Sequence, residues 1–221
     1  MTDDPRPFTP ERYDALVRAA LDAGYRFARF GDAQPADGDL LLRHDVDLSL
    51  DAAVAMAEIE TGLGASSTYF VMTQSPFYNL DSAVGRDAVE RLRALGHRVA
   101  YHGVWPNAAV DRRFGFDPLL AWHNPDPGYM TRPVAGADNA MDPRFTGEGF
   151  ANYRSDSNMR WRHGDVLPDL RRRRFAWLQL LIHPELWMFP GETLRDKLLA
   201  MLDADRTARL EIMRHERLDI D

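Results

Sequence analysis

Two patterns of apolar residues alternate along the chain. Short apolar runs, typical of buried strands in a parallel sheet, occur at residues 40–46, 67–72, 97–102, 119–123 and 177–183. Between them, apolar residues recur at helical spacing, with capping residues at the start and Gly at the end of several segments. This alternation predicts a largely parallel α/β architecture, and we expect residues 1–221 to form a single domain.

The first strong strand runs directly into charged residues, in the order Leu40-Leu41-Leu42-Arg43-His44-Asp45-Val46-Asp47. In a strand, residues two positions apart point to the same face, so Asp45 and Asp47 project together. Two neighbouring carboxylates at the buried end of a strand repel each other unless a cation or hydrogen-bond donors compensate them. The pattern therefore indicates either a metal site or, as the alternative, a helix cap by Asp47 with Asp45 in a polar loop.

Composition excludes several classes of function. The 221 residues contain no cysteine, which rules out disulfides and thiolate zinc sites. The formal net charge of -7 argues against a nucleic-acid partner, because no basic surplus is available for phosphates. The acidic first residues do not resemble a signal peptide, and no apolar run is long enough for a transmembrane segment. We therefore expect a cytoplasmic protein.

Three of the seven histidines, His102, His123 and His183, end predicted strands. They share this position with Asp45 and Asp47, and open α/β sheets and barrels place their chemistry at the carboxyl ends of parallel strands. A single histidine there is more often a hydrogen-bonded structural residue, but several converging on one end favour a site. The other histidines differ in position: His44 lies inside the acidic cluster, and we assign no role to His97, His163 or His215.

A set of motifs in a fixed order resembles the polysaccharide deacetylase superfamily, the NodB-homology or family 4 carbohydrate esterases. The similarity is greatest to the WbmS-like branch, whose first motif is Arg-His-Asp-Val-Asp. The matching segments are 43–47, 95–102, 122–125, 154–157, 161–162 and 181–187, which extend over about residues 40–190. The resemblance implies a distorted (β/α) barrel of about seven strands and a metal-dependent deacetylase activity.

The resemblance also implies catalytic roles. In that family the first motif supplies a general base and a metal ligand, which would be Asp45 and Asp47 here. The last motif, an apolar strand that ends in histidine, supplies the general acid, which would be His183. The family's third motif contains an arginine, and this chain has no convincing match to it. The residue that tunes the base is therefore unassigned.

The metal site departs from the family at one position. The second motif supplies two histidine ligands four residues apart, and His102 fits the first of them, whereas the second position is Pro106. Proline cannot bind metal through its side chain, so we expect His123 to replace that ligand. Asp47, His102 and His123 would then hold one divalent ion of the zinc type with an open coordination position.

Four further residues are candidates for contacts with substrate. His44 lies within the first motif, and Asp156 is expected at the edge of the site, where it would orient a histidine or the substrate. Trp161 and Trp187 could stack on a sugar ring, although packing in the core is the alternative for both. The backbone N–H near Trp105 is expected to help stabilise an oxyanion.

The segment Asn124–Asn152 is rich in Pro, Gly and Asp, and we expect it to cover the site and set substrate choice. The combined prediction is a hydrolase of C–N bonds other than peptide bonds, which removes an N-acetyl group from an amino sugar or a polysaccharide precursor. Two alternatives remain open: hydrolysis of another non-peptide C–N bond, or a catalytically silent barrel that binds sugar.

Overall fold

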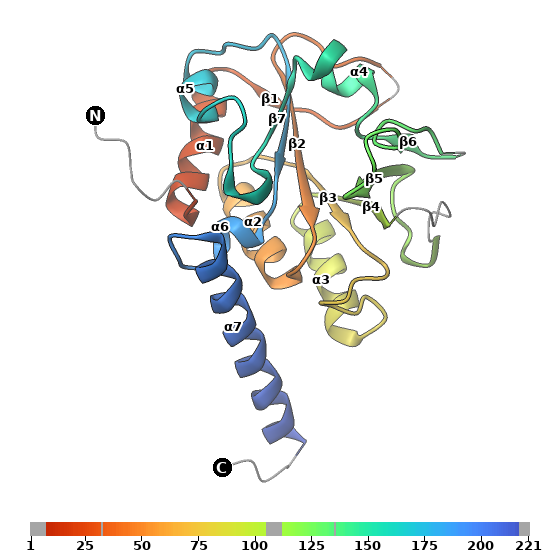
Figure 1. Cartoon of the computed structure of the whole chain (residues 1–221), viewed down its shortest axis with the longest axis vertical. Coiled ribbons are helices and arrows are strands. Elements are labelled where there is room, and N and C mark those ends of the chain that lie inside the picture. Colours follow the sequence, from red (N-terminus) through yellow and green to blue (C-terminus); the bar gives the residue numbers. More distant parts are fainter. Residues whose placement is uncertain (1–7, 32, 105–111, 135, 217–221) are drawn as a thin grey trace.

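Eight parallel strands form one sheet in the computed structural model, which describes residues 8–31, 33–104, 112–134 and 136–216 (Figure 1). Seven of them follow the order β6-β5-β4-β3-β2-β8-β7, and β1 pairs with the start of β2 off this path. The strands are β1 (Arg26–Phe27), β2 (Asp39–Val46), β3 (Thr68–Val71), β4 (Arg98–Val104), β5 (Leu119–His123), β6 (Asp138–Asn139), β7 (Tyr153–Ser155) and β8 (Leu178–Ile182).

The helices begin and end where the sequence supplies caps. Thr9 and Ser49 accept hydrogen bonds from the backbone N–H groups of the first turns of α1 and α2, as predicted. The helices are α1 (Pro10–Asp22), α2 (Leu50–Gly62), α3 (Ala83–Ala94), α4 (Pro143–Thr146), α5 (Val166–Arg171), α6 (Glu185–Met188) and α7 (Leu194–His215). Figure 1 shows α1, α2 and α3 outside the curled sheet, and α7 extending away from it.

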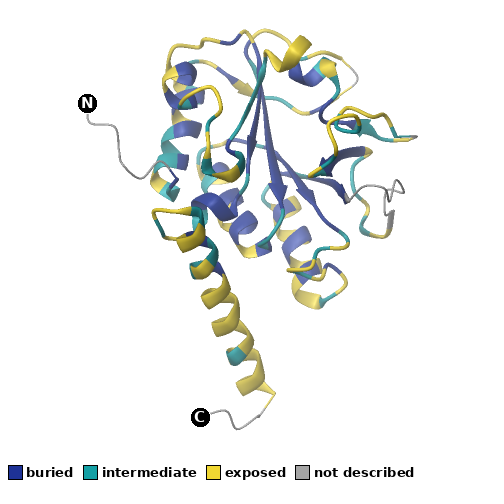
Figure 2. Cartoon of the chain, viewed as in Figure 1, coloured by how far each residue is buried: buried dark blue, intermediate teal, exposed yellow. Residues whose placement is uncertain are grey.

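Almost all of β2 is buried (Figure 2), and its side chains alternate between two environments. Leu40 and Leu42 pack outward against α1, α5 and α6 in the largest apolar cluster. Leu41 packs inside the curl of the sheet with Phe70 and neighbouring apolar residues. Because the side-chain period of a strand is two, Arg43 and Asp45 continue the inner face, whereas His44 continues the outer face.

The sheet curls like part of a barrel but does not close, since β6 and β7 form its two edges. The expectation of a (β/α)₇-type barrel is therefore confirmed for the parallel strands and the curvature of the sheet. It is wrong in one respect, because the sheet does not close into a barrel. A buried side chain bridges the opening: Gln179 on β8 donates hydrogen bonds to the carbonyl oxygens of Ala140 and Phe145, at 2.8 and 3.0 Å. Polar contacts thus connect the segment after β6 to the other half of the sheet.

Other expectations need correction. The segment Asn124–Asn152, expected to be irregular, contains β6, α4 and a 3₁₀ turn (Glu148–Phe150, η2). The spacing of Leu194, Leu198, Leu199 and Leu202 predicts a C-terminal helix that opens at Pro190, but the helix begins after Thr193, because a capping box forms between Thr193 and Asp196. On the predicted apolar face, Leu199 and Leu202 are 48% and 50% exposed. None of the helices in the described part of the chain is both long and apolar enough to cross a membrane.

Candidate metal centre and active site

Three potential metal ligands converge at the carboxyl ends of three parallel strands of the sheet. Asp47 follows β2 directly, His102 lies near the end of β4, and His123 is the last residue of β5. Asp47 Oδ1 lies 3.1 Å from His102 Nε2 and 3.0 Å from His123 Nδ1. The ligand atoms of all three residues lie within 4.8 Å of one another, so the cluster predicted from the sequence could hold a metal ion.

The hydrogen bonds of His102 support a cation at this cluster. His102 Nδ1 lies 3.0 Å from the carbonyl oxygen of Ala121, which can only accept, so Nδ1 carries a proton. In neutral His102 the bare Nε2 then faces a carboxylate oxygen of Asp47, and two acceptors face each other unless a cation lies between them. Two imidazoles and one carboxylate form a donor set that suits Zn²⁺.

Electrostatics at the cluster favour the charged carboxylate. Burial raises the pKa of Asp47, but the imidazole nitrogens of His102 and His123 beside it and nearby positive charge lower it more, and the net pKa is well below its ordinary range. A hydrogen bond to Asp47 raises the pKa of His123. Asp47 is therefore ready to bind a cation at neutral pH.

Asp45 forms a buried ion pair with Arg43. Arg43 Nε and Nη2 donate to the two carboxylate oxygens of Asp45 at 2.7 and 2.6 Å. Burial raises the pKa of Asp45, but the guanidinium outweighs it and the net pKa is below its ordinary value. Arg43 is thus the charged partner of Asp45 that the sequence left unassigned, and it comes from the same strand.

His183, directly after β8, is held from behind by Asp156. Its Nδ1–H and its backbone N–H donate to Asp156 at 2.6 and 3.0 Å, and Trp187 Nε1–H donates to the same carboxylate at 2.7 Å. Its Nε2 lies 4.0 Å from Asp47 Oδ2. Burial lowers the pKa of His183, but Asp156, Asp47 and Asp45 overcome this effect and raise it to about 10.

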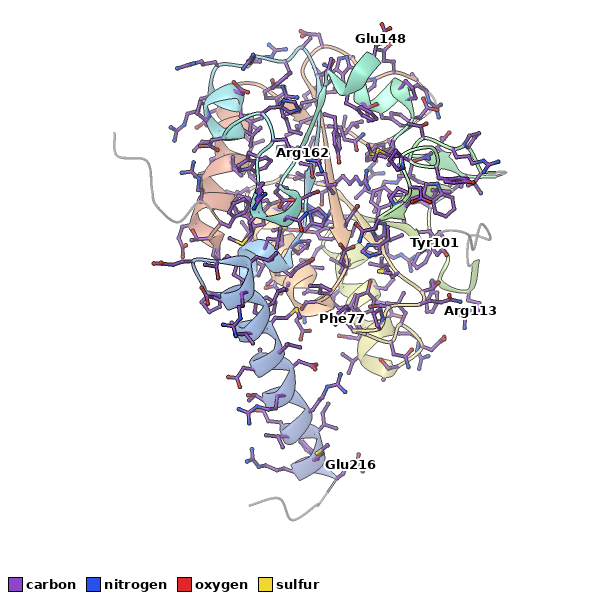
Figure 3. The ribbon with its side chains drawn as sticks, in the orientation of Figure 1. Phe77, Tyr101, Arg113, Glu148, Arg162 and Glu216 are labelled. Carbon is purple, nitrogen blue, oxygen red and sulfur yellow. The ribbon has the colours of Figure 1, made fainter. Side chains whose placement is uncertain are left out.

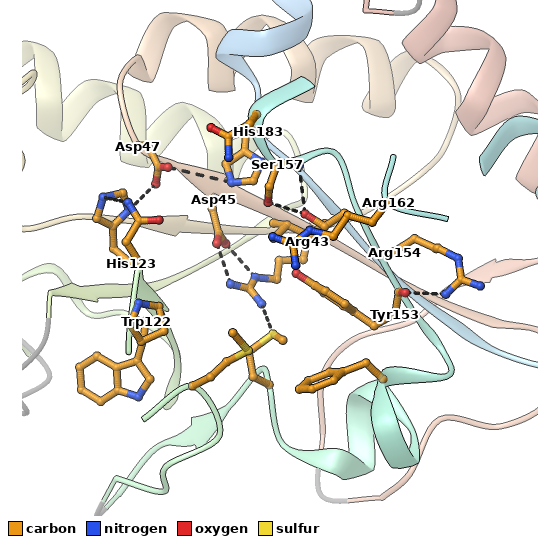
Figure 4. A pocket seen from close by; sticks show the side chains of 18 of the residues that line it. Arg43, Asp45, Asp47, Trp122, His123, Tyr153, Arg154, Ser157, Arg162 and His183 are labelled. Carbon is orange, nitrogen blue, oxygen red and sulfur yellow. Dashed lines mark hydrogen bonds and ion pairs between the residues drawn. The ribbon is translucent and has the colours of Figure 1, made fainter. Parts of the chain in front are cut away.

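These groups border one cavity of about 480 Å³ (Figure 4). Asp45, Asp47, His102, His123 and His183 all line it. The segment 124–152 also lines it, through Asn124, Pro125, Met130, Met141, Gly149 and Phe150. The expectation that this segment lies at the site is therefore confirmed, while its effect on substrate choice stays a prediction.

The four predicted substrate-binding residues lie outside the cavity lining. His44 is fully buried on the outer face of β2, because it follows the alternation that turns Arg43 and Asp45 inward. Trp187 is also fully buried. The Trp161 ring stacks on the Phe8 ring, with 6.2 Å between the ring centroids, and packs against Trp187, so both tryptophans have core roles. Asp156 is fully buried behind His183 and orients this histidine, which was the other role expected for it.

A polar cluster around Glu60 accounts for the buried histidines on the outer face. Glu60 accepts hydrogen bonds from Tyr13, Ser67 and Tyr69 and lies 2.6 Å from His44 Nε2. His97 Nδ1 lies 3.3 Å from the second oxygen of Glu60. This arrangement compensates a fully buried carboxylate and fixes β2 against α2, so we assign it a structural role.

Sequence reasoning missed the polar side of the cavity that β7 and the following turn provide. Tyr153, Ser155, Ser157, Asn158 and Arg162 line this side. In the motif at residues 154–157 the sequence indicates Asp156 alone, whereas the structure places Ser155 and Ser157 at the cavity. Strand alternation was the available signal, since Tyr153 and Ser155 share one face of β7.

Scans of the chain against protein-family models, curated proteins and solved structures return no match. The resemblance to polysaccharide deacetylases therefore stays a prediction from the motifs. Trp105 and Pro106, which the sequence connects with the oxyanion and with the missing ligand, lie outside the described residues.

Proposed function

We propose that the chain is a metal-dependent hydrolase that removes an acyl group, N-acetyl in the first instance, from an amino sugar or polysaccharide precursor. One observation carries the proposal: a candidate base, Asp45, and a candidate acid, His183, line the same cavity as the Asp47–His102–His123 cluster. Hydrolysis of an unactivated amide needs this combination of proton acceptor, proton donor and electrophile.

Each residue would have a distinct task. Asp45 accepts the proton of the attacking water. Arg43 donates one hydrogen bond to each oxygen of Asp45, but a carboxylate has about four lone-pair positions, so Asp45 can still accept a proton. His183 donates its Nε2 proton to the leaving amine, while Asp156 stabilises the imidazolium and fixes the ring. When held by Asp47, His102 and His123, a divalent ion would polarise the amide carbonyl and lower the pKa of water.

The substrate class rests on the shape and polarity of the cavity. Its volume of about 480 Å³ suits a single sugar unit with its acyl group. Hydroxyl and amide side chains of Ser155, Ser157 and Asn158 lie on one side, and Trp122 and Phe150 offer apolar surface elsewhere. Sugars present both hydroxyls and apolar ring faces, and this lining matches both.

The test compares two substrates that differ in leaving group. His183→Ala should reduce hydrolysis of an N-acetyl amino sugar by about 10²-fold or more, as expected for loss of an acid catalyst. It should largely spare an activated aryl acetate, whose leaving group departs without a proton. Release of no acetate by the zinc-loaded wild-type chain from either substrate would contradict the proposal.

Metal analysis separates this proposal from the silent sugar-binding barrel. A hydrolase of this type should purify with, or take up, about one divalent ion per chain. Asp45 and His183 beside the cluster favour an enzyme, since a sugar-binding protein has no need of a paired base and acid. Hydrolysis of a cyclic amide but not of an acetamide would instead favour the alternative enzyme function, hydrolysis of another non-peptide C–N bond.

A further inference from the structure

A second hollow lies next to the cavity and shares part of its lining. Residues 157–163, here called the 157–163 rim, follow β7 and contain a 3₁₀ turn (Ser157–Met159, η3). A hollow of about 850 Å³ lies on the other side of the rim, next to the N-terminus of α7. Three rim residues line both spaces: Ser157, Asn158 and Arg162. The rim therefore separates the two spaces, and a ligand in either of them can contact it. Figure 3 labels Arg162 on this loop.

The rim is basic in an otherwise acidic chain. It contains Arg160, Arg162 and His163 and no carboxylate, although the chain as a whole has a net charge of -7. Both arginines are exposed, and neither forms an ion pair with any of the described residues. Arg154 does not belong to this group, because its guanidinium lies 4.5 Å above the Phe175 ring and points away from Asp45 (Figure 4).

The carboxylates of the cavity cannot neutralise the rim. Among the described residues, Asp45 and Asp47 are the only acidic ones that line the cavity, and Glu192, which lines the second hollow, forms no ion pair with Arg160 or Arg162. Arg43 occupies both oxygens of Asp45, and two histidines face Asp47. The positive charge of Arg162 at the mouth of the cavity is therefore open to an anion from outside the chain.

The backbone of the rim is held in an unfavourable conformation. Asn158 and Met159 both have left-handed torsions, with φ of 57° and 55°. Asparagine tolerates this region, but methionine does so at a cost of about 1 kcal/mol or more. Asn158 lines the cavity together with two other left-handed residues outside glycine, Asn124 and Phe150, whereas Met159 lines the second hollow. Strained backbone concentrated around one cavity is typical of a binding site.

We propose that the substrate carries an anionic group, a phosphate or a carboxylate, next to its acylated sugar, and that Arg162 binds this anion with support from Arg160. The sugar occupies the cavity, and the anion lies on the rim between the two hollows. Guanidinium groups form two-point hydrogen bonds with both anions, which suits this task. This inference rests on the proposed function, because that function places the acylated sugar near Asp47.

The experiment measures binding without turnover. Three ligands that lack an amide are compared by calorimetry on the intact zinc-loaded chain: methyl glucosaminide, glucosamine 1-phosphate and muramic acid. The first is uncharged apart from its amine, the second adds a phosphate and the third adds a carboxylate. Arg162→Gln is the test variant, and Arg172→Gln is the control, since Arg172 is exposed on the turn after α5 and lines neither hollow.

The wild-type chain and Arg172→Gln should bind at least one anionic ligand about tenfold more tightly than methyl glucosaminide, and Arg162→Gln should abolish this preference. The preferred ligand tells whether the anion is a phosphate or a carboxylate. Equal affinity for all three ligands, no binding of any of them, or equal losses in both variants would overturn the inference.

Acetate release from an N-acetyl amino sugar is measured separately on the same preparations. A chain that shows the Arg162-dependent preference but releases no acetate contradicts the proposed function alone. A chain that releases acetate but shows no such preference contradicts the anion site alone.

Discussion

Arg43 and Asp45 lie two residues apart on β2 and form a two-point ion pair. The Arg43 side chain is 2% exposed and the Asp45 side chain is 6% exposed. The pair lies on the inner face of the sheet, beside the residues of the candidate metal centre. A buried guanidinium is tolerated because Asp45 compensates its charge, and Gln179 Oε1 and Met141 Sδ lie within 3.4 and 2.8 Å of its Nη1. The two residues therefore depend on each other for both stability and charge state.

Replacement of Arg43 should be strongly destabilising. Arg43→Met leaves Asp45 buried without its cation, and we expect the free energy of unfolding to fall by about 3 kcal/mol or more. The pKa of Asp45 should rise, because the largest charge that opposes the effect of burial is removed and only His102 and His183 still lower it. Chemical denaturation checks the first effect. Arg26→Met is the control, since it removes a surface pair with Asp39 and should cost less than about 1 kcal/mol. Similar losses in both variants would show that the buried pair contributes nothing special.

Asp45 and Asp47 should differ in metal binding although both line the cavity. Asp47→Ala removes a predicted ligand and should abolish stoichiometric zinc binding. Asp45→Asn should keep the zinc and lose turnover, because an amide cannot take a proton from water. Elemental analysis together with an acetate-release assay distinguishes the two. Equal zinc loss in both variants would mean that the carboxylates act as a pair of ligands.

Asp156 should control the pH dependence of turnover through His183. The proton donor must be protonated, so activity should fall as pH rises through the pKa of His183, which Asp156 helps to raise to about 10. Asp156→Asn removes the largest charge that raises this pKa, so the alkaline limb should move to lower pH. The histidine resonances followed by NMR in the metal-free chain report the same shift. An unchanged limb would show that another group titrates there.

The Glu60 cluster should make the fold sensitive to acid. Burial raises the pKa of Glu60, but His44 and the other donors lower it more, and burial lowers the pKa of His97. Both groups have a lower pKa in the folded chain than in the unfolded chain, so the unfolded chain binds protons more readily. The contribution of the two groups to the free energy of unfolding is therefore fully present above about pH 6.5. It should decrease as pH falls below about 6.5 through His97 and further below about 4.3 through Glu60. Denaturation midpoints measured between pH 8 and pH 3 test this order, and Glu60→Gln should flatten the lower part of the curve.

The sequence predicted correctly that Asp47, His102 and His123 lie together, because simple strand rules apply there. Each of Asp47, His102 and His123 ends an apolar run, and the ends of neighbouring parallel strands meet at one edge. The same alternation places His44 outward, yet its position inside a charged motif suggested a role in the site. Alternation was thus the more reliable guide than proximity in sequence.

The parts that the sequence could not predict depend on long-range packing. β6 and β7 have two and three residues, too few for a periodic pattern, and they form only by pairing with β5 and β8. Trp161 and Trp187 lie in motifs, but their burial depends on Phe8 and α1, which are distant in sequence. The sequence did not indicate the partner of Asp45, because the resemblance implies an arginine in a separate motif, whereas Arg43 pairs with Asp45 from the same strand.

The open side of the sheet divides the site into two modules. The spacing of Asp47, His102 and His123 follows from the register of β2, β3, β4 and β5, which an unbroken hydrogen-bonded ladder fixes. The segments that shape the rest of the cavity belong to the two edges, where Gln179 is the polar link between them. Under the proposed function, we expect insertions or exchanges at 124–152 or 157–163 to change the specificity of the cavity while Asp47, His102 and His123 stay in place, so that one scaffold would serve different substrates.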